Sequence, residues 1–108
     1  MVRVGFPRSG RGQVVRYELE QDMYRFRSTI LMPAPAKAFG LEKLAAELLE
    51  RNRTTRVVAF GLTRRGHVEA WIDQRASTLY ADELRFYLTT LAAEADRLEY
   101  LFSGKDLH

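Results

Sequence analysis

The order of apolar and polar residues changes its period several times along the chain, and each change predicts a new element. From Gln13 onward, apolar residues alternate with charged ones at Val15, Tyr17 and Leu19, which is typical of a half-buried strand. Residues 21–22 make a short polar break, which predicts an antiparallel hairpin with the run that follows. The apolar face of that second strand is formed by Tyr24, Phe26, Ser28, Ile30 and Met32.

The middle of the chain predicts a short helix. Pro33-Ala34-Pro35 ends the first hairpin, because proline cannot donate a hydrogen bond to a neighbouring strand. The helix begins either at Gly40 or near Pro35, and Asn52 suits a left-handed cap at its end. A single apolar stripe at helical spacing is formed by Leu41, Leu44, Ala45, Leu48 and Leu49.

Residues 56–72 predict a second hairpin. It turns at Arg64-Arg65-Gly66, where Gly66 can adopt the positive φ that short hairpin loops require. Trp71 falls on the face opposite to Ile72. A large aromatic side chain there would be partly exposed on a monomer, which favours a partner that covers it.

A long C-terminal helix is predicted from Leu79 to Phe102, with Gly104 as the residue that ends it. The predicted order is therefore β-β-α-β-β-α, an α+β fold with an antiparallel sheet, a short middle helix and a long C-terminal helix. This single domain covers residues 13–108. Residues 1–12 are basic and contain Gly10 and Gly12, so we expect a flexible N-terminal arm.

Composition narrows the class of protein but gives little chemistry. The chain has 108 residues, which is the length of one domain, and no cysteine, which excludes disulfides and cysteine metal sites. No apolar run has the length of a signal peptide core or a membrane span, so we expect a cytoplasmic protein. The two histidines, His67 and His108, have no spaced partner, and no metal, cofactor or catalytic residue is predicted.

Carboxylates could still supply acid–base chemistry if burial separated their pKa values. Glu94, Asp96 and Glu99 lie together on the last helix, but the helical period places them on its solvent side. We therefore do not expect an enzyme.

Arginine supports a nucleic-acid alternative. Residues 1–65 carry 13 basic and 6 acidic side chains, and 14 of the 17 basic residues in the chain are arginine. A stacking platform needs aromatic residues on the same face as the arginines, whereas Tyr24 and Phe26 point away from their arginine neighbours. Phosphate contacts alone stay possible, and the candidate residues are Arg25, Arg27, Arg56, Arg64 and Arg65.

The segment from Tyr24 to Lys105 resembles YbjN-like proteins, whose fold is similar to that of the class I type III secretion chaperones. The likeness rests on four local signals: the Pro33-Ala34-Pro35 turn, the leucine-striped helix that ends at Asn52, the hairpin turn at Arg65-Gly66 before Val68, and the helix entry at Leu79–Leu84. Those families usually open with a helix, which residues 1–12 do not predict.

The resemblance implies a non-enzymatic, chaperone-like adaptor that acts as a homodimer and holds another protein. In secretion chaperones the middle helix commonly builds the dimer, so this helix and the partly exposed tryptophan are the expected interface. The predicted interface residues are Leu41, Leu44, Leu48, Leu49 and Trp71.

Overall fold

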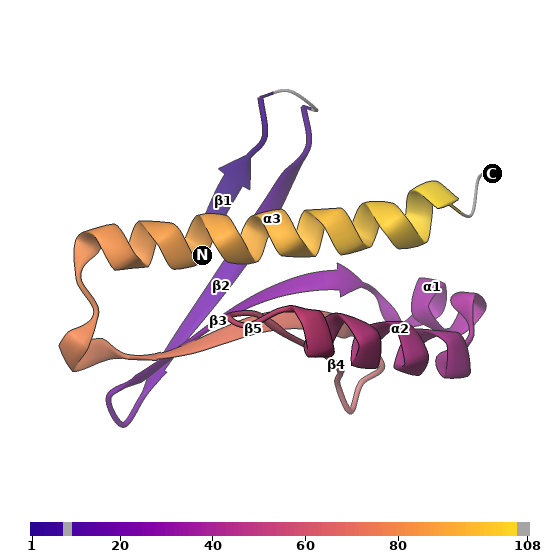
Figure 1. The fold of residues 1–108 in the computed structure, drawn as a ribbon, viewed down its shortest axis with the longest axis horizontal. Helices are drawn as coiled ribbons and strands as arrows, with labels where there is room; N and C mark the ends of the chain where they lie inside the picture. The colour runs from indigo at the N-terminus through magenta and orange to yellow at the C-terminus, as the bar shows by residue number, and fades with distance from the viewer. Residues whose placement is uncertain (8–9, 106–108) are drawn as a thin grey trace.

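The structure, a computed structural model, describes residues 1–7 and 10–105 of the chain (Figure 1). Its elements in chain order are β1 (Val2–Gly5), β2 (Gly12–Glu20), β3 (Met23–Leu31), α1 (Pro33–Phe39), α2 (Leu41–Thr54), β4 (Ala59–Leu62), β5 (Val68–Arg75), the 3-10 turn η1 (Ala76–Thr78) and α3 (Ala81–Lys105). The strands pair in one antiparallel sheet in the order β1-β2-β3-β5-β4. The predicted α+β class is confirmed, with one more strand and one more helix than the sequence predicted.

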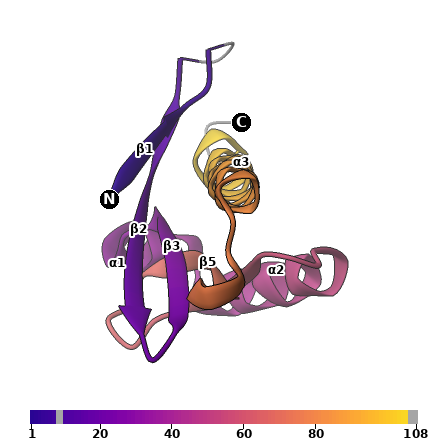
Figure 2. The same ribbon diagram turned by 90° about the vertical axis from the view of Figure 1, so that its left-hand side faces the viewer.

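The long helix α3 lies across one face of the sheet, and the main core lies between them (Figure 2). Phe26 of β3, Ile72 of β5, and Leu91 and Leu98 of α3 are each at most 2% exposed. Full burial of one such side chain contributes about 1.5–3 kcal/mol, so this layer is the main source of stability. No helix of the described residues lies on the opposite face of β2, β3 and β5 (Figure 2), which is lined largely by charged side chains.

The N-terminal residues differ from the predicted flexible arm. Val2–Gly5 form β1, which pairs with residues 12–15 of β2. Figure 2 shows the β1–β2 hairpin rising beside α3 while β3 and β5 pass beneath the helix. Val4 and Phe6 are partly buried against the core. These two apolar side chains explain why the segment is structured despite its basic, glycine-containing sequence.

The two predicted strands of the first hairpin are confirmed, but their burial is not uniform. Val15 is fully buried, whereas Tyr17 and Leu19, on the same face, are more than half exposed. The register of β3 against β5 shifts between Thr29 and Leu31. The chain leaves the sheet after that irregularity, so Met32 is exposed at the start of α1 and does not join the buried face.

The sequence predicts one helix that begins either near Pro35 or at Gly40. The structure has two helices, and one begins at each of these places. Gly40, at a φ of 106°, separates α1 from α2. Asn52 does not cap α2, which continues to Thr54. Its side-chain amide instead donates to the carbonyl oxygen of Phe60, and its side-chain oxygen accepts from the Phe60 N–H, at 2.9 and 2.8 Å. Helix α2 therefore covers the outer edge of β4.

The remaining predicted turns are confirmed in part. Gly66 has a φ of 89° in the β4–β5 turn, as predicted. Gln21 and Asp22 both have positive φ, the pattern of a two-residue hairpin turn of type I′. Gly104 lies inside α3 and does not end it. In the described part of the chain, no helix combines the length and the apolar character needed to cross a membrane.

Candidate functional site: an apolar groove beside an open strand edge

An apolar groove lies where the start of α3 meets β2 and β3. Its volume is about 530 Å³, and none of its described lining residues is charged. Three aromatic rings from the two strands line it in series: Tyr24 contacts Tyr17 edge-on at 6.4 Å and stacks on Phe26 at 5.6 Å. The remaining lining residues are Val2, Ala76, Leu79, Tyr80, Ala81, Leu84 and Leu88. Along β2 the burial changes at this groove: Val15 is fully buried, whereas Tyr17 is more than half exposed.

The groove borders an unpaired edge of the sheet. Strand β1 pairs with β2 only over residues 12–15, so residues 16–20 have β3 on one side and no described strand on the other. All five of these residues are exposed. Unpaired strand edges are templates for pairing with another chain, and proteins commonly cover them.

The hairpin register determines which backbone groups point out from this edge. In a two-residue hairpin, the residues that flank the turn exchange backbone hydrogen bonds, and the pattern then alternates along the strand. Glu20 pairs with Met23 and Glu18 with Arg25, so the N–H and C=O groups of these residues point toward β3. The N–H and C=O groups of Tyr17 and Leu19 therefore point away from β3, toward the open edge.

The two faces of the open edge differ in chemistry. Tyr17 and Leu19 lie on the groove face, whereas Glu18 and Glu20 lie on the helix-free face. There, a hollow of about 520 Å³ is lined by three carboxylates and one guanidinium, those of Glu18, Glu20, Asp73 and Arg25. Arg25 is bound to Asp73 by two hydrogen bonds of 2.7 and 2.8 Å, which holds the pKa of the Asp73 carboxyl below its ordinary value. The edge is thus apolar on one side, and on the other it carries Glu18 and Glu20 next to Arg16.

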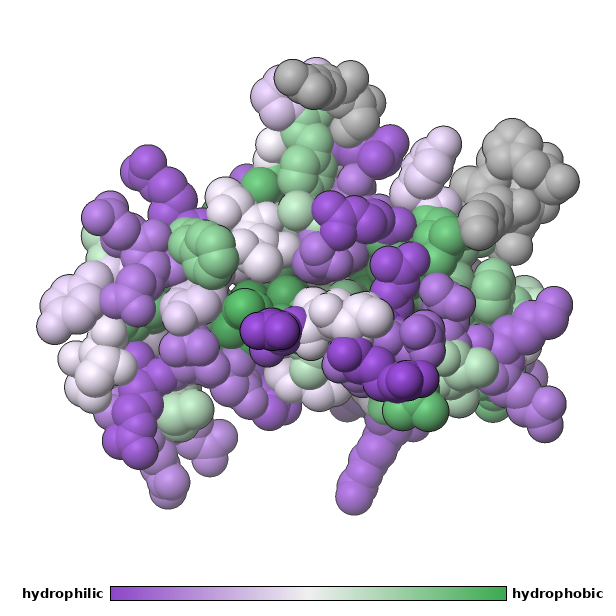
Figure 3. All heavy atoms as spheres, viewed as in Figure 1, coloured by the Kyte–Doolittle hydropathy of each residue, from purple (hydrophilic) through white to green (hydrophobic). Residues whose placement is uncertain are grey.

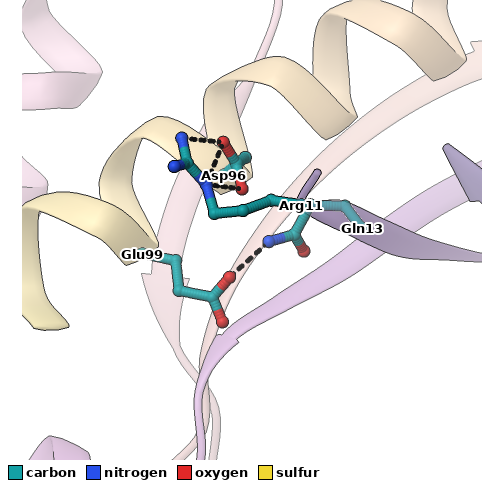
Figure 4. A network of polar contacts seen from close by, with 4 residues as sticks. All are labelled: Arg11, Gln13, Asp96 and Glu99. Carbon is teal, nitrogen blue, oxygen red and sulfur yellow. Dashed lines mark hydrogen bonds and ion pairs between the residues drawn. The ribbon is translucent and has the colours of Figure 1, made fainter. Parts of the chain in front are cut away.

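A polar network fixes the β1–β2 hairpin on α3 and so holds the groove in place (Figure 4). Arg11 donates to both carboxylate oxygens of Asp96, and its guanidinium lies 4.7 Å from the centre of the Tyr100 ring. Gln13 donates to Glu99 at 2.5 Å and accepts from the Ser28 hydroxyl at 2.9 Å. The prediction that these two carboxylates lie on the solvent side of α3 is wrong: Asp96 is only 7% exposed, and Glu99 accepts from Gln13 of β2. These groups are satisfied by neighbours and serve as structural contacts.

Glu99 gives this network a predicted pH dependence. Burial raises the pKa of its carboxyl above the ordinary 4.5, and nearby Asp96 adds to the rise, against the hydrogen bond from Gln13 and the charge of Arg11. Because the pKa of Glu99 is higher in the folded than in the unfolded protein, folding favours the protonated form of its carboxyl. The stability that Glu99 contributes is therefore lost as the pH rises from 4.5 through the folded-state pKa.

Replacing Glu99 by glutamine is expected to raise the thermal midpoint at pH 7, because glutamine still accepts from Gln13 and carries no charge to desolvate. The difference from the wild type should be small near pH 4.5 and grow as the pH rises. Glu20→Gln, which removes an exposed charge from β2, controls for net charge. Equal midpoints of wild type and Glu99→Gln across this range would exclude the contribution.

The predicted interface residues do not lie on one surface. Leu44 and Leu48 are 1% and 5% exposed and belong to the core of the single chain, so they are not available to a partner. Leu41 and Leu49 are exposed on α2. Trp71 is partly exposed on the helix-free face, where a Cβ added at Gly61 would lie 2.7 Å from its ring. The predicted α2 interface is thereby reduced to two leucines.

The arginines predicted to contact nucleic acid do not all lie at one place. Arg27, Arg64 and Arg65 line one hollow on the helix-free face, together with Arg16, which the sequence had not singled out. Arg25 is bound to Asp73 in the neighbouring acidic hollow. Arg56 precedes β4 and lines neither hollow. Among the described residues, no group of three or more histidine or acidic side chains is arranged to hold a metal ion.

Comparisons with known proteins give no match: no protein-family model, no curated protein and no solved structure matches the chain. The resemblance to YbjN-like proteins and to type III secretion chaperones therefore stays a prediction, and function has to be argued from the site alone.

Proposed function

We propose that the protein is a non-enzymatic binding module that holds an extended segment of another protein. One observation carries the proposal: the unpaired edge of β2 at residues 16–20 lies directly beside the apolar groove. An added strand would receive backbone hydrogen bonds from Tyr17 and Leu19 and would place alternate side chains in the groove. This is the general mode of peptide recognition by strand addition.

The chemistry of the two faces specifies the kind of segment. Side chains of an added strand alternate between faces, so every second one would enter the groove formed by aromatic and aliphatic side chains. The side chains between them would face Glu18 and Glu20. A segment in which apolar residues alternate with lysine or arginine is therefore the expected partner, because opposite charges on neighbouring strands are favourable and like charges are not.

The two edges of the sheet support this choice of surface. On the β4 side, the side chain of Asn52 and helix α2 cover the outer strand. The β1 edge is four residues long and carries Arg3. Residues 16–20 of β2 also carry charged side chains, but no described strand covers them, and Tyr17 among them lines the apolar groove. The open part of β2 is thus the edge best suited to a partner.

A homodimer built on α2 has less support than the groove. Leu41 and Leu49 supply its remaining apolar side chains. Figure 3 shows a largely hydrophilic surface with apolar side chains in small separate patches on the face that carries α2. Apolar side chains scattered in this way are normal on a protein surface and do not by themselves indicate an interface. We therefore propose the partner to be another polypeptide at the β2 edge, and a dimer is not needed to complete the site.

A titration with synthetic peptides tests this function. The full chain is mixed with a fluorescently labelled peptide in which valine alternates with lysine, and binding is measured by anisotropy. We expect saturable binding of this peptide and much weaker binding of the valine–glutamate peptide, because of the carboxylates at residues 18 and 20. A block peptide with the same valines and lysines grouped separately is the composition control. Equal binding of all three peptides, or of none, would contradict the proposal.

A further inference from the structure

A second hollow lies on the helix-free face, away from the apolar groove. Its volume is about 370 Å³, and it is lined by guanidinium groups from three places in the chain: Arg16 of β2, Arg27 of β3, and Arg64 and Arg65 of the β4–β5 turn. Thr29 and Thr63 add hydroxyl groups to the lining. Glu69 is the one carboxylate among its described lining residues, so the hollow is strongly positive.

The charge of this hollow is neutralised only in part by the described residues. In the described part of the structure, no hydrogen bond or ion pair engages the side chains of Arg16, Arg64 or Arg65. Arg27 is bound to Glu18 at 2.9 Å and lies 3.9 Å from Glu69, yet its Nε atom is buried without an acceptor. Arg16, Arg64 and Arg65 line one hollow without an ion pair of their own, an arrangement suited to an anion with several oxygen atoms.

The sheet order places an aromatic side chain on the same face. Arg16 pairs with Arg27, and Arg27 pairs with Trp71 on the next strand, so the three side chains form one row across the sheet. The Trp71 ring is partly exposed, and the guanidinium of Arg25 lies 5.7 Å from its centre. Arginines and an aromatic ring on one exposed face are the combination that binds single-stranded nucleic acid. Tyr24 and Phe26, the aromatics next to these arginines in sequence, lie on the other face.

We infer that the helix-free face binds single-stranded nucleic acid, with phosphates at the hollow formed by Arg16, Arg27, Arg64 and Arg65 and a base against Trp71. Several phosphates in series fit arginines from three elements better than one phosphate does. An acidic peptide would use the arginines equally well but would leave the tryptophan without a role. This inference concerns the face opposite to the apolar groove and does not depend on peptide binding there.

The test uses Trp71 as its own reporter, because it is the only tryptophan in the sequence. The full chain is titrated with single-stranded oligothymidylate and, separately, with inorganic polyphosphate, at a series of salt concentrations. We expect the oligonucleotide to quench the tryptophan fluorescence and its affinity to fall steeply with salt, because phosphate contacts release counterions. Polyphosphate should compete for the site without comparable quenching.

Variants assign the contacts. The double change Arg64→Gln and Arg65→Gln, at an exposed turn, is expected to reduce the salt slope by about 1.4, because each phosphate contact to a single strand contributes about 0.7. Arg97→Gln, on α3 and paired with Glu94, is the matched control and should leave the slope unchanged. Three results would each overturn the inference. They are absence of quenching by the oligonucleotide at low salt, a salt slope of the double variant equal to that of the wild type, and tighter binding of polyphosphate than of the oligonucleotide.

Discussion

Replacing Leu19 by proline is expected to lower the affinity for the valine–lysine peptide at least about tenfold while the fold is kept. The N–H of Leu19 points away from β3, so proline removes a hydrogen-bond donor from the open edge and none from the β2–β3 ladder. Proline is tolerated on edge strands for this reason. The measurement is peptide anisotropy, with circular dichroism to verify that the variant is folded.

Two further variants separate the backbone effect from the side-chain effect. Leu19→Ala removes the apolar side chain but retains the N–H, and should weaken binding less than proline does. Glu18→Pro removes a donor that points toward β3, so it should destabilise the hairpin itself. If Leu19→Pro binds the peptide as tightly as Leu19→Ala, the backbone of β2 does not take part in recognition.

Replacing Asn52 by alanine is expected to lower the free energy of unfolding by about 1–3 kcal/mol, because the Phe60 N–H and C=O lose their partners in a partly buried position. The loss should be visible as a lower midpoint of chemical denaturation. Because the Phe60 N–H and C=O are then unpaired at the outer edge of β4, the variant should also associate more readily at high concentration.

The neighbouring residue provides the control for this substitution. Arg53 lies on the same turn of α2, is highly exposed and forms only a surface ion pair with Glu50, so Arg53→Ala should change stability by about 0–1 kcal/mol. Asn52→Asp retains the acceptor for the Phe60 N–H but loses the donor, and should lie between the two. Equal stabilities of Asn52→Ala and Arg53→Ala would show that the contact to β4 contributes little.

The periodicity of the sequence predicted the elements well, because each pattern reports which side of a strand or helix is apolar. It did not predict what covers that side. The leucine stripe of α2 was predicted as a partner surface, yet Leu44 and Leu48 pack into the core of the same chain, while Leu41 and Leu49 stay exposed. Tyr17 and Leu19 continue the alternation of Val15 but lie past the residues that pair with β1, and both are more than half exposed.

The candidate sites depended on contacts between distant segments, which local patterns do not encode. Asp96 was predicted to be solvated because its partner Arg11 belongs to a segment that was predicted to be unstructured. Trp71 was assigned to one function and Arg27 to another, because the sequence does not show that β3 lies between β2 and β5. Sheet order, which is set by packing of the whole chain, brings them into one row.

Amide hydrogen exchange, followed residue by residue by nuclear magnetic resonance with and without the valine–lysine peptide, tests the central claim most directly. The open edge predicts that the amides of Tyr17 and Leu19 exchange rapidly in the free protein, because they point toward solvent. On addition of the peptide, these two amides should become protected, while those of Glu18 and Glu20 are already protected by β3. Protection that appears on α2 or β4, with Tyr17 and Leu19 unchanged, would contradict recognition by strand addition at β2.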